Sequence, residues 1–329
     1  MRTATVVSVA LHNPSDLDDP DERVGTNLDN VTALLDHVAG YDPDVVVFPE
    51  KVLHHACKSM LPEVAEPIPG PSTAAVGEMA RAIDSYVVVG LYERDGEDLY
   101  NAAVLLDRDG SVLGTYRKVA PSQSELDHGI TPGTEVPVWD TPLGGIGMAI
   151  CWDGRYPEIG THLGTNGADL VCFPTLGSTH EALATWAQYN GYHVAVCDKN
   201  GARMHTPYRS VRADVSHRWK NPEVETIDLH GGRAALSVAT INTDCRSYSK
   251  ADDVVWDWPN AIRERYPGAT NVHVAQDDGV VVVECVDDDL TLDDLEAEFD
   301  MVGTREFEDG VRARVHTVVD DSPLLHVDD

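Results

Sequence analysis

Apolar residues along the chain alternate between short β-type runs and segments with helical spacing. Residues 6–10, 45–48 and 87–91 are dense in valine and predict buried strands. Apolar positions at helical spacing predict a helix over residues 28–38, and Pro71 marks the start of a second helix that extends to about residue 83. This alternation predicts an α/β layered domain rather than a β-sandwich.

The same alternation continues through the middle of the chain. A hairpin is predicted around the turn at residues 107–110, and a later apolar strand ends at Ile150, before a helix that follows Tyr156. The remaining predicted core elements are strands at residues 170–173, 194–197 and 234–241 and a helix at residues 181–191.

The C-terminal part differs in composition from the rest. Residues 251–329 contain 22 acidic and only 5 basic side chains, yet residues 280–283 are four consecutive valines, which is too apolar for a disordered tail. Thr291 can cap a helix whose third residue is Asp294. We therefore predict one domain over residues 1–244 and an ordered acidic extension over residues 245–329, packed on the core or on a partner subunit.

The composition excludes several classes of partner. The chain has 329 residues, 56 acidic against 24 basic side chains, and a formal net charge of −32. The negative electrostatic field of such a chain repels nucleic acid and anionic membrane surfaces. No apolar stretch approaches the roughly 18 residues that a membrane helix needs, and the first residues resemble a strand rather than a secretory signal. We expect a cytoplasmic protein.

The acidic surface itself needs an explanation. The chain has only six lysines, and acidic residues exceed basic ones both in residues 1–250 and in residues 251–329. This distribution favours a protein adapted to a high-salt cytoplasm over an ordinary domain with an acidic tail.

If the high-salt interpretation is correct, the melting temperature should rise as KCl increases from low to molar concentration, because salt screens the repulsion between carboxylates. Thermal unfolding at a series of KCl concentrations measures this. A melting temperature independent of salt contradicts adaptation to salt.

The six cysteines are scattered and contain no Cys-x-x-Cys pair, so neither a zinc ribbon nor a disulfide framework is predicted. His54, His55 and Cys57 lie close in sequence. Adjacent histidines point in different directions on a regular element, so a metal site there is not expected, and we take them as polar loop residues near the pocket mouth.

Three reactive side chains follow predicted strands. Glu50 ends the segment Phe48-Pro49-Glu50 after a buried strand, and Lys118 ends Tyr116-Arg117-Lys118 after the hairpin. Cys151 begins Cys-Trp-Asp-Gly-Arg-Tyr-Pro-Glu158, where a strand breaks into a turn before a helix. Such an elbow exposes a nucleophile and leaves backbone N–H groups free for a developing oxyanion.

Together these three motifs resemble the signatures of the carbon–nitrogen hydrolase family, also called the nitrilase superfamily. Supporting segments are Tyr100-Asn101-Ala102, Thr131-Pro132-Gly133 and Phe173-Pro174-Thr175, and the resemblance covers roughly residues 3–200. It implies a four-layer αββα sandwich and a Glu-Lys-Cys triad. It also implies a homodimer or a larger homo-oligomer.

The resemblance assigns roles to individual residues. Cys151 is the nucleophile, Glu50 the general base and acid, and Lys118 the cation that stabilises the tetrahedral intermediate together with the backbone N–H of Trp152. Lys118 is also expected to favour the thiolate of Cys151. Glu125 is assigned as a fourth, positioning carboxylate, with Asp127 close enough to compete.

These roles imply a hydrolase that cleaves a non-peptide C–N bond of a small amide or N-carbamoyl compound through a Cys151 thioester, without a metal or an organic cofactor. The cysteine motif is more similar to amidase and carbamoyl hydrolase versions than to nitrilases. Trp152, Arg155 and Thr175 are the predicted substrate-binding residues. Arg155 either binds a substrate carboxylate or pairs structurally with Glu158 or a helix end. The alternatives are a nitrilase, a Cys-His dyad enzyme and a non-catalytic scaffold.

Overall fold

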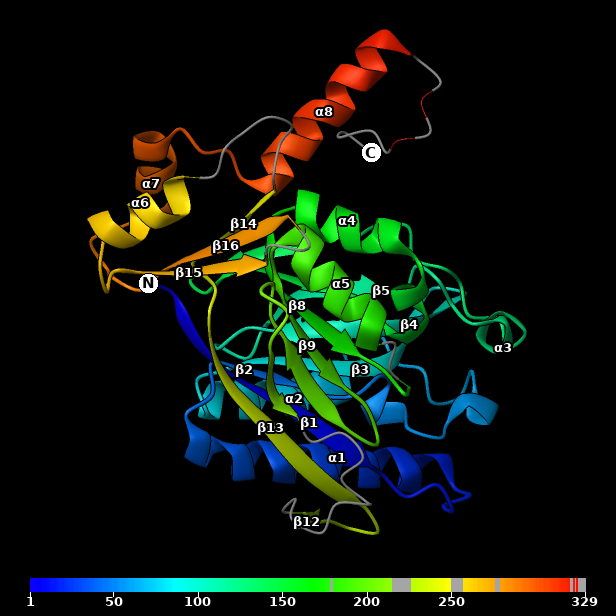
Figure 1. The fold of residues 1–329 in the computed structure, drawn as a ribbon. Coiled ribbons are helices and arrows are strands. Elements are labelled where there is room, and N and C mark those ends of the chain that lie inside the picture. Colours follow the sequence, from blue (N-terminus) through cyan, green and yellow to red (C-terminus); the bar gives the residue numbers. More distant parts are fainter. Residues whose placement is uncertain are drawn as a thin grey trace.

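The computed structural model describes residues 1–177, 180–214, 226–249, 257–275 and 279–319, with the single positions 322 and 324. Within these residues the chain forms two large β-sheets that face each other, each covered by helices, and a third small sheet near the C-terminus (Figure 1). This confirms the predicted layered α/β fold.

The first large sheet has the strand order β12-β13-β1-β2-β3-β4-β5. Its strands are β1 (Thr3–His12), β2 (Val45–Val47), β3 (Tyr86–Asp95), β4 (Asp98–Leu106), β5 (Val112–Arg117), β12 (Ile227–Asp228) and β13 (Arg233–Asn242). Two helices, α1 (Pro20–Val38) and α2 (Pro71–Ala82), cover its outer face in the lower part of Figure 1. Strands β1, β2 and β3 are parallel neighbours, so their carboxyl ends meet at one edge.

The second large sheet has the order β11-β10-β9-β8-β7-β6. Its strands are β6 (Val138–Thr141), β7 (Gly144–Met148), β8 (Ala168–Pro174), β9 (His193–Cys197), β10 (Ala202–His205) and β11 (Val211–Asp214). Helices α4 (Pro157–Thr165) and α5 (His180–Asn190) lie above it in Figure 1. The short helix α3 (Gln123–Leu126) follows β5.

The strand pattern explains why the layers stack. In β1, Val6 and Ala10 point into the apolar layer between the two large sheets, whereas Val7 and Val9 point toward α1 and α2. Alternate residues of a strand face opposite sides of its sheet, so a run of valines gives a strand that is buried on both faces. The valine-rich runs in the sequence are therefore inner strands of a four-layer sandwich.

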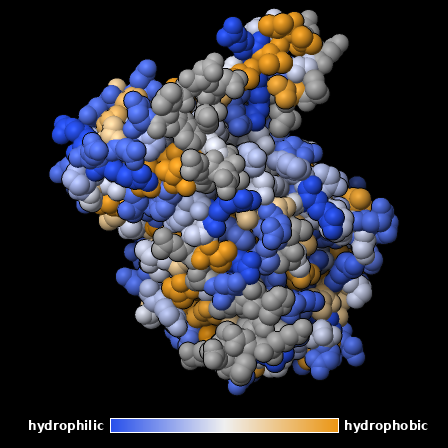
Figure 2. Space-filling view, viewed as in Figure 1, coloured by the Kyte–Doolittle hydropathy of each residue, from blue (hydrophilic) through white to orange (hydrophobic). Residues whose placement is uncertain are grey.

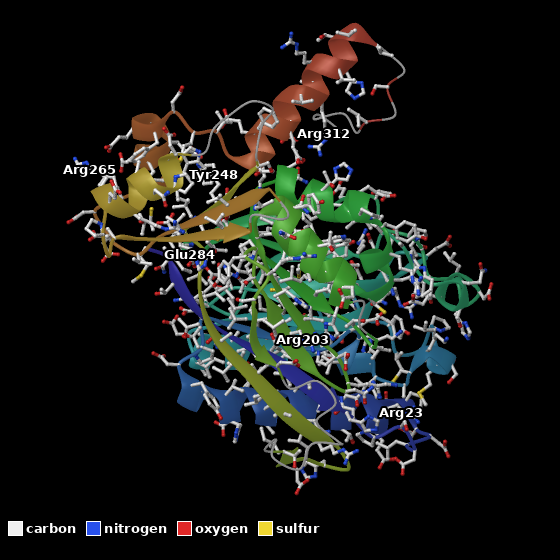
Figure 3. The ribbon with its side chains drawn as sticks, in the orientation of Figure 1. Arg23, Arg203, Tyr248, Arg265, Glu284 and Arg312 are labelled. Atoms are coloured by element: carbon white, nitrogen blue, oxygen red, sulfur yellow. The ribbon has the colours of Figure 1, made fainter. Side chains whose placement is uncertain are left out.

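The C-terminal residues build a third sheet of order β14-β16-β15, made of β14 (Cys245–Ser249), β15 (Thr270–Ala275) and β16 (Val280–Cys285). Helices α6 (Trp258–Arg265), α7 (Leu292–Phe299) and α8 (Thr304–Val318) accompany it. This sheet has an apolar cluster of its own that includes Tyr248, labelled with Glu284 in Figure 3. The predicted cap is confirmed, because the Thr291 hydroxyl accepts a hydrogen bond from the Asp294 N–H at 3.1 Å.

The extension contacts the core at two places, near β14, which is the first strand of the extension, and near the start of α8, which is its last helix. The Arg305 side chain of α8 donates to the backbone oxygen of Asn190 at 2.6 Å. Beyond this contact α8 projects from the body (Figure 1), and Figure 2 shows hydrophobic surface in the same upper region. The exposed apolar side chains of α8 include Phe307, Val311 and Val318. Among the described residues, no helix is long and apolar enough to cross a membrane.

Candidate active site

Two carboxylates and an ammonium group meet at the edge where the inner strands end. Glu50 lies three residues after β2, and Lys118 follows β5 directly. The Lys118 Nζ donates hydrogen bonds to Glu50 Oε1 at 2.9 Å and to Glu125 Oε2 at 2.8 Å. All three side chains are at most 3 % exposed. Because charges this deeply buried are costly unless paired, these contacts are strong interactions rather than surface ion pairs.

Cys151 begins the 3-10 turn η4 (Cys151–Arg155) after β7, with a positive φ of 48°. A non-glycine residue in this left-handed region is strained, and such strain collects at functional sites. Asp153 fixes the turn from within, because its buried carboxylate accepts hydrogen bonds from the Ile150 N–H, the Ala120 N–H and the Tyr116 hydroxyl, each at 2.8 Å. The elbow is therefore tied both to the second sheet and to the loop that follows Lys118.

The thiol of Cys151 lies close enough to Glu50 and Lys118 for both charges to act on it. Burial and the Glu50 charge raise the pKa of Cys151 above its ordinary value, and the opposing effect of Lys118 does not offset them. Lys118 therefore favours the thiolate, as expected from the sequence, but burial and the Glu50 charge outweigh it. The thiol keeps its proton at neutral pH, so a nucleophilic Cys151 needs a base at the moment of attack.

Both glutamates are held as anions. Burial alone would raise their pKa values, but Lys118 and Lys51 lower them, and the pKa of Glu125 falls to about 2. The Glu125 carboxylate also accepts the N–H and the hydroxyl of Ser122. For Glu50, Oε1 accepts the described hydrogen bonds, and Oε2 accepts none from the described residues. Glu50 can thus act as a base through Oε2, whereas both carboxylate oxygens of Glu125 already accept hydrogen bonds.

Two further residues complete the cluster and were missed by the sequence analysis as site residues. Asn101 of β4 donates from Nδ2 to Glu50 Oε1 at 2.7 Å and to Glu125 Oε1 at 2.6 Å. Lys51 places its Nζ 3.9 Å from Glu50 Oε1 and 3.6 Å from Glu125 Oε1. The segment Tyr100-Asn101-Ala102 and the lysine next to Glu50 were visible signals, but only the fold turns these side chains inward.

A glycine in β3 makes room for the Glu50 turn. Lys51 adopts a left-handed conformation with φ 43°, and its backbone lies directly on Gly90. A Cβ atom at Gly90 would collide with the Lys51 N–H group. This close approach accounts for a glycine inside an otherwise valine-rich strand.

The other sequence-predicted residues lie around this cluster in different ways. Asp127 is exposed and bonds to Gln123, so Glu125 is the carboxylate that enters the site. Thr175 is buried beside the Cys151 thiol and donates to the Gly177 oxygen. His54 was expected in a loop at the pocket mouth, which was wrong: it is 1 % exposed and its Nδ1 accepts the Tyr92 N–H.

Arg155 does not form the predicted pair with Glu158, and its predicted role in binding a substrate carboxylate stays a prediction. The side chain is exposed, and its guanidinium stacks 4.2 Å from the centroid of the Trp152 ring. In the described part of the chain it makes no ion pair with Glu158. Trp152 is itself 38 % exposed, so the stacked pair forms part of the surface next to the Cys151 turn.

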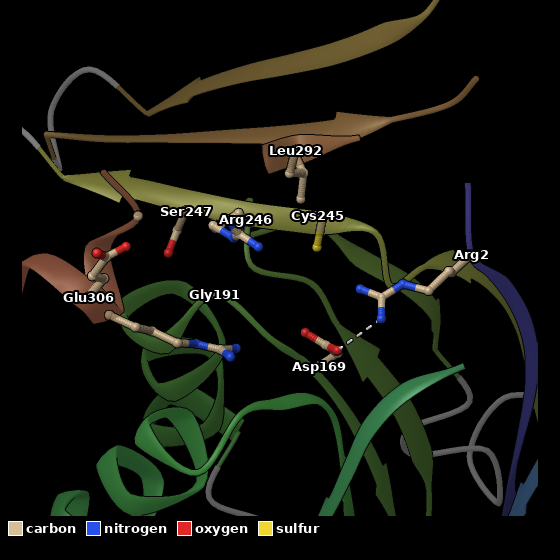
Figure 4. A pocket seen from close by; sticks show the side chains of 10 residues that line it. Arg2, Asp169, Gly191, Cys245, Arg246, Ser247, Leu292 and Glu306 are labelled. Atoms are coloured by element: carbon tan, nitrogen blue, oxygen red, sulfur yellow. Dashed lines mark ion pairs between the residues drawn. The ribbon is translucent and has the colours of Figure 1, made fainter. Parts of the chain in front are cut away.

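A separate cavity of about 290 Å³ lies between the core and the extension (Figure 4). Two of the arginines that line it form ion pairs with carboxylates, Arg2 with Asp169 at 3.6 Å and Arg246 with Glu296 at 2.6 Å. None of the predicted catalytic residues lines this cavity. No group of three or more His, Cys, Asp or Glu side chains in the described residues is arranged to hold a metal ion.

Comparison with known proteins gives consistent results. The family model "Carbon-nitrogen hydrolase" matches residues 9–219. Similar curated proteins include a bifunctional nitrilase/nitrile hydratase NIT4B of Nicotiana tabacum, 34 % identical in an alignment of 178 residues that covers 46 % of this chain and 49 % of that protein. Nitrilase 2 of Arabidopsis thaliana is 37 % identical over 130 residues, which are 39 % of this chain and 37 % of that protein. The chain thus matches half or less of the length of these relatives.

Solved structures agree on the fold. Nit3 of Saccharomyces cerevisiae, described as a member of branch 10 of the nitrilase superfamily, has a TM-score of 0.59 at 18 % identity and covers 81 % of this chain and 95 % of its own. An amidase from Nesterenkonia sp. has a TM-score of 0.55, also at 18 % identity, and covers 71 % of this chain and 89 % of its own. These likenesses support the αββα arrangement and leave the substrate open.

Proposed function

Because the chain belongs to the carbon–nitrogen hydrolase family, we propose that it hydrolyses a non-peptide C–N bond of a small amide or N-carbamoyl compound through a thioester on Cys151. The observation that carries this proposal is the buried Lys118 ammonium, which bridges Glu50 and Glu125 next to a protonated cysteine on a strained turn. A nucleophile, a base and a cation thus share one enclosed site.

In the first half of the reaction, Glu50 Oε2 takes the thiol proton as the Cys151 sulfur attacks the amide carbon. The carbonyl oxygen becomes negative and is met by the Lys118 ammonium. That ammonium has three N–H bonds, and the described contacts with Glu50 and Glu125 use two of them. The Trp152 N–H, in the first turn of η4, is the second donor in this proposal. Glu50 then returns the proton to the departing nitrogen, and the C–N bond breaks.

In the second half, water attacks the thioester carbon while Glu50 takes one of its protons. The C–S bond breaks, the acid leaves, and the proton returns to the sulfur. The balance is one amide and one water consumed, with one acid and one ammonia or amine released. Glu125 and Asn101 keep Glu50 and Lys118 in position throughout, and no metal or organic cofactor takes part.

A nitrile is the second candidate substrate, because the curated relatives include nitrilases. The same thiol can add to a nitrile carbon, and hydrolysis of the resulting thioimidate also leads to the thioester. The cysteine motif, which is more similar to amidase and carbamoyl hydrolase versions, keeps an amide as the first proposal, and the match to the curated nitrilases spans half or less of their length. The predicted homo-oligomer and cytoplasmic location stay expectations.

The test is a substrate panel assayed in high-salt buffer, with small amides, N-carbamoyl amines and nitriles side by side. We expect ammonia or amine release from at least one amide or carbamoyl compound, and a mass increase on Cys151 equal to the acyl group when the reaction is quenched. Turnover of nitriles alone would replace the amidase proposal by the nitrilase proposal. Release without an adduct at Cys151, even under rapid quenching, counts against the thioester.

A further inference from the structure

Lys51 is a second buried ammonium in the site, and the reaction proposed above gives it no chemical step. It follows Glu50 directly, and its side chain is only 12 % exposed. The Nζ lies 3.6 Å from Glu125 Oε1 and 3.9 Å from Glu50 Oε1, and 5.5 Å from the centroid of the Tyr92 ring. Its strained backbone conformation against Gly90 directs it back over the carboxylates.

The charges around Glu50 come from every element that packs there. Lys118 follows β5, Glu125 lies in α3, Lys51 follows Glu50 itself, and the Cys151 thiol begins η4. Asn101 of β4 is neutral, and the Tyr92 hydroxyl of β3 keeps its proton because burial raises its pKa. These two carboxylates and two ammonium groups together carry no net charge. The Asp153 carboxyl of η4 also acts on Lys118, and burial raises its pKa to about 6.

One ammonium cannot hold two adjacent buried carboxylates ionised throughout the reaction. Without Lys51 the cluster would carry a net charge of −1, and two carboxylates sharing a site favour uptake of a proton by one of them. Lys118 must in addition turn toward the negative oxygen of the tetrahedral intermediate. A protonated Glu50 could not accept the thiol proton, and Cys151 is a thiol in the resting protein.

We propose that Lys51 is a positioning residue that keeps Glu50 ionised and aligned as the base for Cys151, which leaves Lys118 free to stabilise the oxyanion. This inference rests on the proposed function. The Lys51 and Lys118 charges both lower the pKa of Glu50 against the effect of burial, and Lys118 adds a hydrogen bond. The pairing is mutual, since Glu50 raises the pKa of Lys51 against the effect of burial.

The experiment compares the pH dependence of kcat/KM in wild type, Lys51→Met and Lys51→Arg. Removing an opposite charge within about 4 Å raises the pKa of a carboxyl group by about 1–3 units. We therefore expect the acid limb of the profile to move up by about 1–2 pH units in Lys51→Met. Lys51→Arg, which keeps the positive charge, should restore the acid limb toward its wild-type position.

Lys58→Met is the matched control, because Lys58 lies in the same segment and bonds to the Ser124 hydroxyl of α3 without touching either glutamate. Its profile should remain that of wild type. If Lys51→Met does not fold, Lys51→Gln gives the same comparison with a polar neutral side chain. An unmoved acid limb in a folded neutral variant overturns the inference while leaving the proposed function intact. Full activity of Cys151→Ala overturns the proposed function itself.

Discussion

Cys151→Ala should lose at least about 10⁴-fold in hydrolysis of whichever amide the wild type accepts, while keeping its fold. The loss is large because alanine cannot form the thioester and the residual site can only polarise the substrate. The fold should survive because Cys151 is half-buried at the edge of the core, and Asp153 holds the turn independently of the thiol. Steady-state kinetics and thermal unfolding of the purified variant measure both effects.

Alkylation gives an independent measure of the same residue. The other five cysteines are buried, and burial raises the pKa of Cys57 to about 11 and that of Cys172 to about 12. Iodoacetamide should therefore modify Cys151 first, with loss of activity in proportion to a single adduct seen by mass spectrometry. Cys57→Ala is the control and should retain activity. Wild-type turnover by Cys151→Ala, or alkylation that leaves turnover unchanged, contradicts the role of this cysteine.

Much of the site could be predicted because its residues follow strands. Glu50, Lys118 and Cys151 each come within a few residues of a strand end, and the carboxyl ends of parallel strands meet at one edge. The valine-rich runs likewise predicted the inner strands, because β-branched residues are favoured in a sheet that is buried on both faces. Local pattern and the general geometry of α/β sheets place these side chains at strand ends, whereas their roles as a Glu-Lys-Cys triad are what the resemblance to the carbon–nitrogen hydrolase family implies.

What could not be predicted depends on where side chains turn in three dimensions. Asn101 lies in a strand, and the sequence pattern shows only that successive side chains of a strand point to opposite faces of the sheet. Lys51 points inward because its backbone adopts a left-handed conformation that packs against Gly90. The protonation state of the Cys151 thiol is a similar case. A sequence shows that a lysine is available, but the balance among burial, Glu50 and Lys118 exists only in the folded site.

Lys118→Met should combine loss of catalysis with loss of stability. The variant removes the ammonium that bridges Glu50 and Glu125 and leaves two buried carboxylates with Lys51 as their remaining cation. Breaking a buried pair by removing one partner costs about 3–5 kcal/mol, so we expect that loss in the free energy of unfolding at pH 7. We also expect a fall of about 10³-fold or more in kcat/KM, because the oxyanion loses its charged donor.

The pH dependence of this destabilisation separates charge from packing. In wild type the pKa of Glu125 is lowered from 4.5 to about 2, so its pairing stabilises the folded state at neutral pH, and that contribution is lost as the pH falls from about 4.5 toward 2. In Lys118→Met only Lys51 remains to offset burial, so the carboxyl pKa values rise and the folded variant takes up a proton. The difference in unfolding free energy between wild type and Lys118→Met should therefore shrink between pH 7 and pH 4.

The double variant Lys118→Met/Glu125→Gln completes the test. Neutralising Glu125 removes the like charge that Lys118 no longer balances, so part of the lost stability should return at pH 7, while kcat/KM should stay low because the donor for the oxyanion is still absent. Urea denaturation and steady-state kinetics on the four proteins of the cycle measure the two quantities. If Glu125→Gln adds its full destabilisation to that of Lys118→Met, the two side chains are not coupled, and the bridging ammonium is not what holds this site together.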